Sequence, residues 1–188
     1  VQALGVRDLD AVGVRDRAIA LASGRVAGPN AQGRAAAAVL QHLLAGLGSR
    51  PSTAGSVTIA WVTQSNLRDT GLQHLARRIT PDRAFLFTTA SLRAPRGAGP
   101  GETPAERAMS FGGNLGKGPL IDAADKVLAT AAGSAGISVQ PLTAGGVGRS
   151  INLRSLGWDK VENHLIALPV RYAQTPVEMI DRADIATM

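Results

Sequence analysis

The chain has 188 residues, with 20 Lys or Arg against 14 Asp or Glu, and no cysteine. This length suits one domain that can bury a sizeable core. The lack of cysteine excludes disulfide bonds, thiolate zinc sites, iron–sulfur clusters and thiol nucleophiles. No stretch approaches the roughly 18 consecutive apolar residues that a membrane-spanning helix needs, so we expect a soluble globular domain with no membrane partner.

The formal net charge of +6 does not predict a nucleic-acid partner. The basic residues are nearly all Arg and are scattered along the chain, and aromatic residues make up only 3% of it. A nucleic-acid-binding surface needs clustered basic residues, and binding of single strands also needs aromatic side chains on which bases stack. We therefore expect no nucleic acid among the partners.

Short apolar pieces broken by glycine and charge predict small β-strands joined by turns over residues 1–28. A helix follows, because Asn30 is a favourable N-cap residue and the apolar residues of 35–47 form a broad face. Residues 56–63 (SVTIAWVT) form an apolar, β-branched run of strand length. This run predicts a buried strand.

The middle of the chain predicts a helix over residues 70–79 and a buried strand over residues 83–89. Residues 92–118 are rich in Gly, Pro and Arg, which predicts a long surface loop. Residues 105–111 are a candidate strand within this loop.

The last third predicts four more elements: a helix over 121–135, a strand over 137–142, a short helix over 149–156 and a strand over 161–170. Strands that alternate with helices in this way indicate an α/β domain. We expect three layers, with a mostly parallel sheet covered by helices on both faces.

No local motif indicates a reaction. His42, His74 and His164 fall in three different predicted elements, with no second His or carboxylate at metal-ligand spacing, so we interpret them as surface or structural histidines. The motifs GxSxG, GxxxxGK[ST] and GxGxxG after a strand are absent. The glycine-rich segment at 112–118 predicts a turn when taken alone.

Several segments from Gly24 onward nevertheless resemble, in order and spacing, a known family. They are the strand at 57–62 followed by Thr63 and Gln64, Pro81-Asp82 before the next strand, the segment LGKGP at 115–119, and the closing segments LPVRY at 168–172 and TPVE at 175–178. The chain thus resembles the tetrahedral-aminopeptidase family, which includes glutamyl aminopeptidases and endoglucanase-like peptidases. This resemblance implies a zinc-exopeptidase-like core, and members of the family hold two zinc ions.

The resemblance also implies where the catalytic and metal-binding residues would stand, and this chain carries neutral residues there. Asn30 stands at the position of the bridging Asp, and Ser65 at that of the Glu that acts as general base. Asn66, Thr88 and Gln174 stand at the positions of a ligand Glu, Asp and His. The family's first His ligand would precede the first residue of this chain.

Neutral side chains are poor ligands for a pair of zinc ions. Carboxylates and imidazoles donate strongly to a doubly charged cation, whereas amides and hydroxyls donate weakly, and two neighbouring cations need several anions. Ser65 also cannot take a proton from water at neutral pH. We therefore expect an inactive homologue with no cofactor and a role in binding or assembly; the alternative is an active aminopeptidase that uses zinc or cobalt through other ligands.

The resemblance further implies a division of the chain and the kind of partner it has. Residues 1–28 are predicted to be a remnant of the family's β-rich insert domain, and residues 29–188 the catalytic-domain core. The core's first strands would precede this chain, and residues 177–188 are predicted to begin a terminal helix. We expect a homo-oligomer or a subunit that carries the missing N-terminal half, peptides as a further class of ligand, and a cytoplasmic location.

Overall fold

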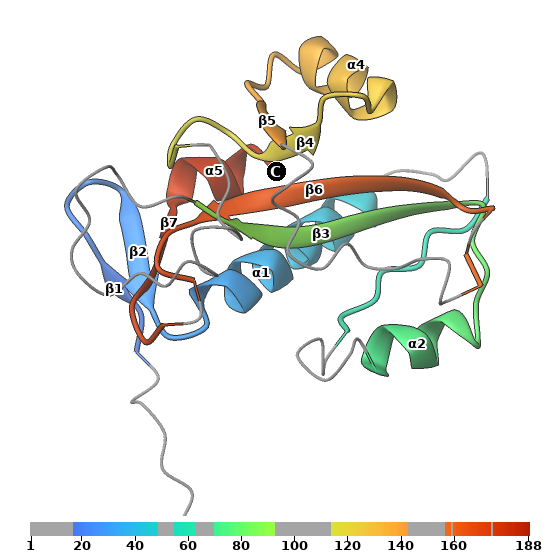
Figure 1. Cartoon of the computed structure of the whole chain (residues 1–188), viewed down its shortest axis with the longest axis horizontal. Helices are drawn as coiled ribbons and strands as arrows, with labels where there is room; N and C mark the ends of the chain where they lie inside the picture. Colours follow the sequence, from blue (N-terminus) through green and yellow to red (C-terminus); the bar gives the residue numbers. More distant parts are fainter. Residues whose placement is uncertain are drawn as a thin grey trace, which may run out of the picture.

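The chain forms a mixed α/β fold with two sheets (Figure 1). The computed structural model describes residues 17–48, 55–62, 70–92, 114–142, 157–158, 160–173 and 175–188. Two sequence predictions, the strand at 105–111 and the helix at 149–156, lie outside these ranges. Within them, no helix has the length and apolar character needed to cross a membrane.

The larger sheet is mostly parallel, as predicted. Its strand order is β3-β6-β4-β5, and the strands are, in chain order, β3 (Arg83–Ser91), β4 (Leu120–Asp122), β5 (Gln140–Leu142) and β6 (Glu162–Val170). β3 pairs with β6 in parallel along its whole length, β4 pairs with β5 in parallel, and β4 pairs with β6 antiparallel. The predicted strands at 83–89, 137–142 and 161–170 are therefore confirmed, the second one shortened.

The smaller sheet is antiparallel and joins segments from the two ends of the chain. It consists of β1 (Ile19–Ala20), β2 (Arg25–Gly28) and β7 (Glu178–Asp181), in the order β1-β2-β7. The small strands expected before residue 29 are thus present where the structure describes this part. Because β2 pairs with β7 along four residues, the two segments are held together directly. The division of the chain at residue 28 stays a prediction.

Helix α1 (Ala31–Leu47) confirms the first predicted helix and runs along β3 and β6 (Figure 1). Its small buried residues Ala31 and Ala35 contact Leu168 and Val170 of β6, together with Ile180 of β7. Alanine side chains let the helix axis come close to the sheet, so the first turns of α1 pack directly on this part of it. In its later turns, Leu43 and Leu44 are exposed.

Helix α2 (Thr70–Ala76) is shorter than predicted and packs near the amino ends of β3 and β6. Its buried Leu72 contacts Ala84, Trp158 and Val161. Side chains alternate along a strand, and Ala84 is in register with residue 163 of β6, so Ala84 and Leu168 lie on opposite faces of the sheet. α1 and α2 therefore contact different faces.

The predicted buried strand at 56–63 is wrong in the described residues 55–62. These residues form no strand, and the side chains of Val57 and Trp61 are 68% and 49% exposed. The Trp61 Nε1–H donates a long hydrogen bond of 3.5 Å to the Ala37 carbonyl oxygen of α1. A strand needs a hydrogen-bonding neighbour as well as β-forming side chains, and within the described residues none pairs with this segment.

The predicted helix at 121–135 is wrong in its first part. Leu120 and Ile121 are buried in β4, and helix α4 (Lys126–Ser134) begins only afterwards. Asp125 sets this start, because its side chain caps the helix by accepting a hydrogen bond of 3.0 Å from the Leu128 N–H. An N-cap aspartate thus overrides the apolar run that the sequence pattern favoured.

The predicted terminal helix over 177–188 is likewise only partly correct. β7 occupies its beginning, and helix α5 (Arg182–Ala186) follows. Asp181 marks the change, since its carboxylate accepts a hydrogen bond of 3.0 Å from the Ala183 N–H.

Gly118 is a position at which a side chain should be strongly destabilising. Its φ of +92° strains any L-residue, and a Cβ there would overlap the Ser138 carbonyl oxygen. We expect Gly118→Ala to lower the free energy of unfolding by about 2–4 kcal/mol in a urea titration.

Gly133, in α4, provides the matched control for Gly118. A Cβ there meets nothing within 4 Å, so Gly133→Ala should stabilise the protein by about 0.5–1 kcal/mol. Equal effects of the two substitutions would contradict the close approach of Gly118 to Ser138.

Candidate functional site

The first turn of α1 meets β3 and β7 through a chain of hydrogen bonds. The Thr89 hydroxyl donates to Gln32 Oε1 at 3.0 Å, and the Gln32 N–H donates to Glu178 Oε2 at 3.1 Å. Glu178 is 2% exposed. The helix N-terminus favours a carboxylate at this place, because its first N–H groups have no partner within the helix.

Asn30 precedes α1 but does not cap it, so the expected N-cap interaction is wrong. Its backbone is left-handed, with φ 53° and ψ 33°, and its side chain makes no capping hydrogen bond. Instead the side chain folds over the first turn of the helix: a Cβ added to Gly33 would lie 2.7 Å from Asn30 Oδ1. In a capped helix the Asn side chain would accept a first-turn N–H. Here Glu178 accepts the N–H of Gln32 instead.

The structure describes two of the five residues at family ligand positions. Asn30 lies at the start of α1, and Thr88 lies in β3 next to Thr89, which bonds to Gln32 of the same helix turn. Side chains alternate along β3, so the Thr88 and Thr89 side chains lie on opposite faces. Ser65, Asn66 and Gln174 lie outside the described residues, and convergence of the five positions stays a prediction.

The donors that are described at this place do not fit a dinuclear zinc centre. Asn30 offers an amide and Thr88 a hydroxyl, both of them neutral. The buried Glu178 carboxylate already accepts the Gln32 N–H. Across the described ranges, no three His, Asp or Glu side chains are grouped so that they could hold a metal ion.

The glycine-rich segment forms a turn over residues 115–117, as predicted, and a buried aspartate fastens it. Asp184 of α5 is 0% exposed and accepts hydrogen bonds from the N–H groups of Gly116 at 2.7 Å and Gly118 at 2.8 Å. Burial raises the pKa of the Asp184 carboxyl, and these hydrogen bonds oppose the rise. These hydrogen bonds therefore connect α5 to the segment that leads into β4.

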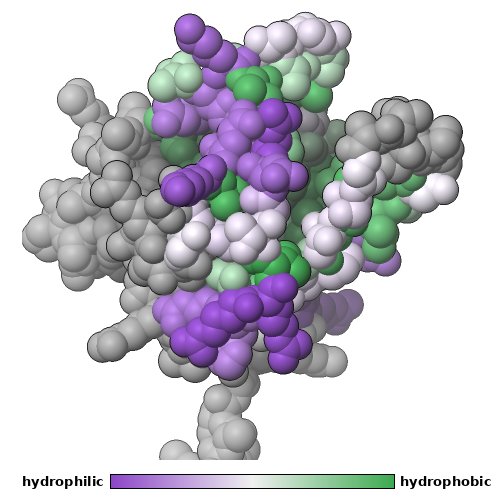
Figure 2. All heavy atoms as spheres, turned by 90° about the vertical axis from the view of Figure 1, so that its right-hand side faces the viewer, coloured by the Kyte–Doolittle hydropathy of each residue, from purple (hydrophilic) through white to green (hydrophobic). Residues whose placement is uncertain are grey.

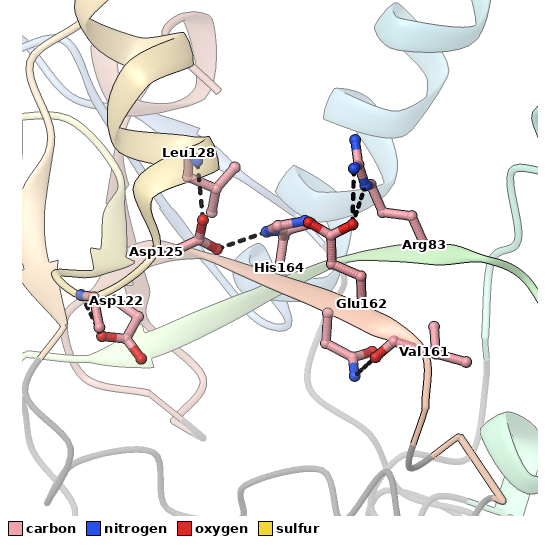
Figure 3. A network of polar contacts seen from close by, with 9 residues as sticks. Arg83, Asp122, Asp125, Leu128, Val161, Glu162 and His164 are labelled. Atoms are coloured by element: carbon pink, nitrogen blue, oxygen red, sulfur yellow. Dashed lines mark hydrogen bonds and ion pairs between the residues drawn. The ribbon is translucent and has the colours of Figure 1, made fainter. Parts of the chain in front are cut away.

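A second polar cluster lies at the amino ends of β3 and β6 (Figure 3). His164 is 4% exposed; its Nδ1 lies 2.8 Å from Asp125 Oδ2 and its Nε2 lies 3.2 Å from Glu162 Oε1. Its ring stacks on Phe85, with 4.8 Å between centroids. Arg83 Nη2 lies 2.7 Å from the other Glu162 oxygen.

Charge and hydrogen bonding keep both carboxylates of this cluster ionised. The hydrogen bond from Arg83 lowers the pKa of Glu162. Burial acts to raise the pKa of Asp125, but hydrogen bonds from the Leu128 N–H and from His164 outweigh it, and the pKa is lowered. Arg83 and Glu162 are half exposed, and this end of the molecule presents hydrophilic residues interspersed with apolar ones (Figure 2).

The interpretation of the histidines is confirmed, but the cluster itself was missed. His42 and His74 are exposed, and His164 is a buried histidine whose two ring nitrogens both have partners. Its Asp125 partner comes from a distant helix cap, which no sequence spacing reveals. The available signal was the spacing of Glu162 and His164, which puts both side chains on one face of a strand.

Comparison with solved structures confirms the resemblance at the level of the fold. No protein-family model and no curated protein matches the sequence. The structure is similar to an aminopeptidase from the archaeon Desulfurococcus kamchatkensis, with a TM-score of 0.73 and 21% identity over 92% of this chain and 49% of that one.

Two further solved structures are similar to this chain in fold. The TET1 peptidase of Pyrococcus horikoshii matches with a TM-score of 0.71 and 22% identity, over 98% of this chain and 54% of that one. A structure described as a putative peptidase/endoglucanase matches with a TM-score of 0.57 and 25% identity, over 94% and 55%. The chain thus has part of the fold of TET aminopeptidases and endoglucanase-like peptidases, and it spans about half their length.

Replacing the Asp184 carboxylate tests how the glycine-rich turn is held. The two Asp184 oxygens each accept one N–H, from Gly116 and Gly118. In Asp184→Asn, an NH₂ group replaces one of these oxygens and faces an N–H that it cannot accept. Leaving a buried donor without an acceptor should lower the free energy of unfolding by about 1–3 kcal/mol, measured by urea titration.

Asp122→Asn is the control for the same chemical change. Asp122 accepts one exposed N–H, from Ala124, which an asparagine oxygen can also accept. We expect a change within about 0.5 kcal/mol. An Asp184→Asn variant as stable as Asp122→Asn would contradict the role of the buried carboxylate.

Proposed function

We propose that this chain is a catalytically inactive relative of dinuclear-zinc aminopeptidases and acts in binding or assembly. The proposal includes a core over residues 29–188 in three layers, with helices on both faces of the mostly parallel sheet. The observation that carries it is the set of neutral residues at the family's catalytic and ligand positions: Asn30, Ser65, Asn66, Thr88 and Gln174.

The neighbourhood of Asn30 supports this loss of charge. Gln32 and Thr89 bond to each other there, and Glu178 is engaged by a backbone N–H. These groups satisfy one another without a cation. A pair of zinc ions would need several anionic ligands at this end of the sheet, and the residues at the family's positions supply none.

An unpaired sheet edge supports the role in assembly. Within the described residues, β3 has a strand neighbour on one side only, which leaves the backbone groups of its other edge without strand partners. Val57, Trp61 and Val62 are also exposed. The Pyrococcus horikoshii TET1 peptidase can assemble into a tetrahedron or a large octahedral shell. We propose that this chain likewise associates, with its own copies or with a subunit that supplies the rest of the fold.

Metal binding and peptidase activity test the proposed inactivity. With excess zinc, cobalt or manganese, we expect no stoichiometric binding in isothermal titration calorimetry and no hydrolysis of aminoacyl anilides above background, because neutral donors bind these cations weakly. The positive control is a variant with the family's residues restored at all five positions and with the first His supplied on a fused N-terminal half. Binding of about two zinc ions per unaltered chain, with metal-dependent turnover, would contradict the proposal.

Light scattering tests the proposed association. At tens of micromolar we expect dimers or larger species, and Val57→Lys should shift the distribution toward monomer by placing a charge on the exposed apolar segment. Val127→Lys is the control, since Val127 is a single exposed apolar residue on α4. A monodisperse monomer of the unaltered chain, or equal effects of the two substitutions, would count against assembly through this surface.

A further inference from the structure

We propose that Arg171, together with Arg25, forms a binding site for the carboxylate of a ligand on the face of the smaller sheet that is turned away from α1. Arg171 belongs to the closing segment LPVRY at 168–172. It extends the smaller sheet by pairing with Met179 of β7 through two backbone hydrogen bonds of 2.9 Å. Carboxylate binding at this place does not depend on whether the chain binds zinc.

The register of the smaller sheet puts the two arginines on one face. In an antiparallel sheet, residues directly opposite each other point to the same side. Arg25 is opposite Asp181 of β7. Arg171 is opposite Met179, two residues before Asp181. Ile180 points to the other side, where it contacts α1. The arginines therefore face away from α1, with their Cα atoms about 12 Å apart in ordinary sheet geometry, so one ligand can lie between the two side chains.

Both guanidinium groups have a donor without an acceptor. The Nε atoms of Arg25 and Arg171 are covered and make no hydrogen bond, although both side chains are partly exposed. Asp181 Oδ2 lies 3.5 Å from Arg25 Nε, and no carboxylate of the described residues pairs with Arg171. Covered polar groups in folded proteins are nearly always hydrogen-bonded, so these two N–H groups stand out as contacts for a ligand. Arginine offers five donors and no acceptor, and an anion therefore suits it best.

The local charge favours a singly charged anion. Among the described residues of the smaller sheet, Asp181 is the carboxylate on this face, and both its oxygens are used: Oδ1 accepts the Ala183 N–H and Oδ2 faces Arg25. Glu178 lies on the opposite face of β7 and is buried. Arg25 and Asp181 thus offset each other, which leaves one positive charge at Arg171. A carboxylate balances that charge and matches the planar guanidinium with two parallel hydrogen bonds, whereas a phosphate dianion would leave excess negative charge.

The backbone that follows Arg171 forms a strained turn. Tyr172 is left-handed, with φ 55°, which is uncommon for a residue other than Gly, Asn or Asp. Its carbonyl oxygen accepts hydrogen bonds from the Thr175 hydroxyl at 2.7 Å and the Thr175 N–H at 3.2 Å. Strained backbone of this kind clusters at ligand-binding sites. The turn fixes the segment that carries Arg171 and leaves the Tyr172 side chain 51% exposed beside it.

Titration with acetate, followed through the arginine Nε–H signals in proton–nitrogen NMR spectra, tests the site. We expect the signals of Arg171 and Arg25 to shift along a saturable curve, and phosphate at the same concentration to act more weakly. The control signal is that of Arg78, an exposed arginine that follows α2, the helix at the other end of the molecule (Figure 1). It should respond to acetate no more than to chloride at equal ionic strength.

A short peptide with a free C-terminal carboxylate, compared with its C-terminal amide, distinguishes the sources of the carboxylate. The amide should leave the Arg171 signal unchanged. Tighter binding of the free acid than of acetate identifies a peptide terminus as the ligand group, and equal binding identifies a free carboxylate.

Arg171→Lys is the informative variant, because it keeps the charge and removes the planar set of donors. We expect it to weaken acetate binding, measured at Arg25, by about tenfold. Arg78→Lys makes the same change at the control position and should leave the affinity unchanged. The titration of the unaltered chain needs no variant, so the site stays testable should Arg171→Lys fold poorly. The proposal is overturned if the Arg171 signal follows ionic strength alone, if phosphate binds more tightly than acetate, or if the two substitutions have equal effects.

Discussion

The parallel pairing of β3 with β6 forms the surface that the other described elements contact. Nine residues of each strand are in register, although about 80 residues separate them along the chain. At the carboxyl half, Leu168 and Val170 form the surface on which α1 packs. In the middle, β4 pairs with β6, and at the amino end Phe85 lies against His164. Loss of this pairing would disrupt both the contact between Thr89 and Gln32 and the cluster around His164.

The two ends of this strand pair differ in charge. The amino end carries the charged groups Arg83, Glu162 and Asp125, and His164 lies between the two carboxylates. The carboxyl end carries the neutral side chains of Thr88, Thr89 and Gln32, and the buried Glu178 carboxylate accepts the Gln32 N–H there. Several carboxylates gathered at the carboxyl end would repel one another without a cation. Neutral residues at the family's ligand positions avoid that repulsion, which is the physical basis of the proposed loss of metal.

The sequence correctly predicted the elements whose apolar pattern and boundaries lie within the element itself. The helix at 31–47 and the strands that became β3 and β6 have long apolar patterns and clear boundaries, and they form as predicted. Residues 55–62 have an equally strong strand pattern but form none, since strand formation depends on a partner from elsewhere. The order and spacing of short motifs along the chain predicted the similarity to the fold of TET aminopeptidases.

The polar sites were harder to predict for the same reason. Asn is a favourable N-cap residue, but the backbone of Asn30 is left-handed and its side chain makes no capping hydrogen bond. Glu178 of β7 accepts the Gln32 N–H instead. The cluster around His164 depends on a helix cap 39 residues away in sequence. Contacts of this kind follow from tertiary packing, which no local spacing encodes.

Anomalous X-ray diffraction at the zinc edge, from crystals of the chain grown with excess zinc, would decide whether the metal centre has been lost. If it has, Asn30, Ser65, Asn66, Thr88 and Gln174 will line one region at the carboxyl ends of the strands, and no anomalous peak will lie among them. Two peaks about 3.5–4 Å apart in that region, coordinated by side chains of this chain, would contradict the loss.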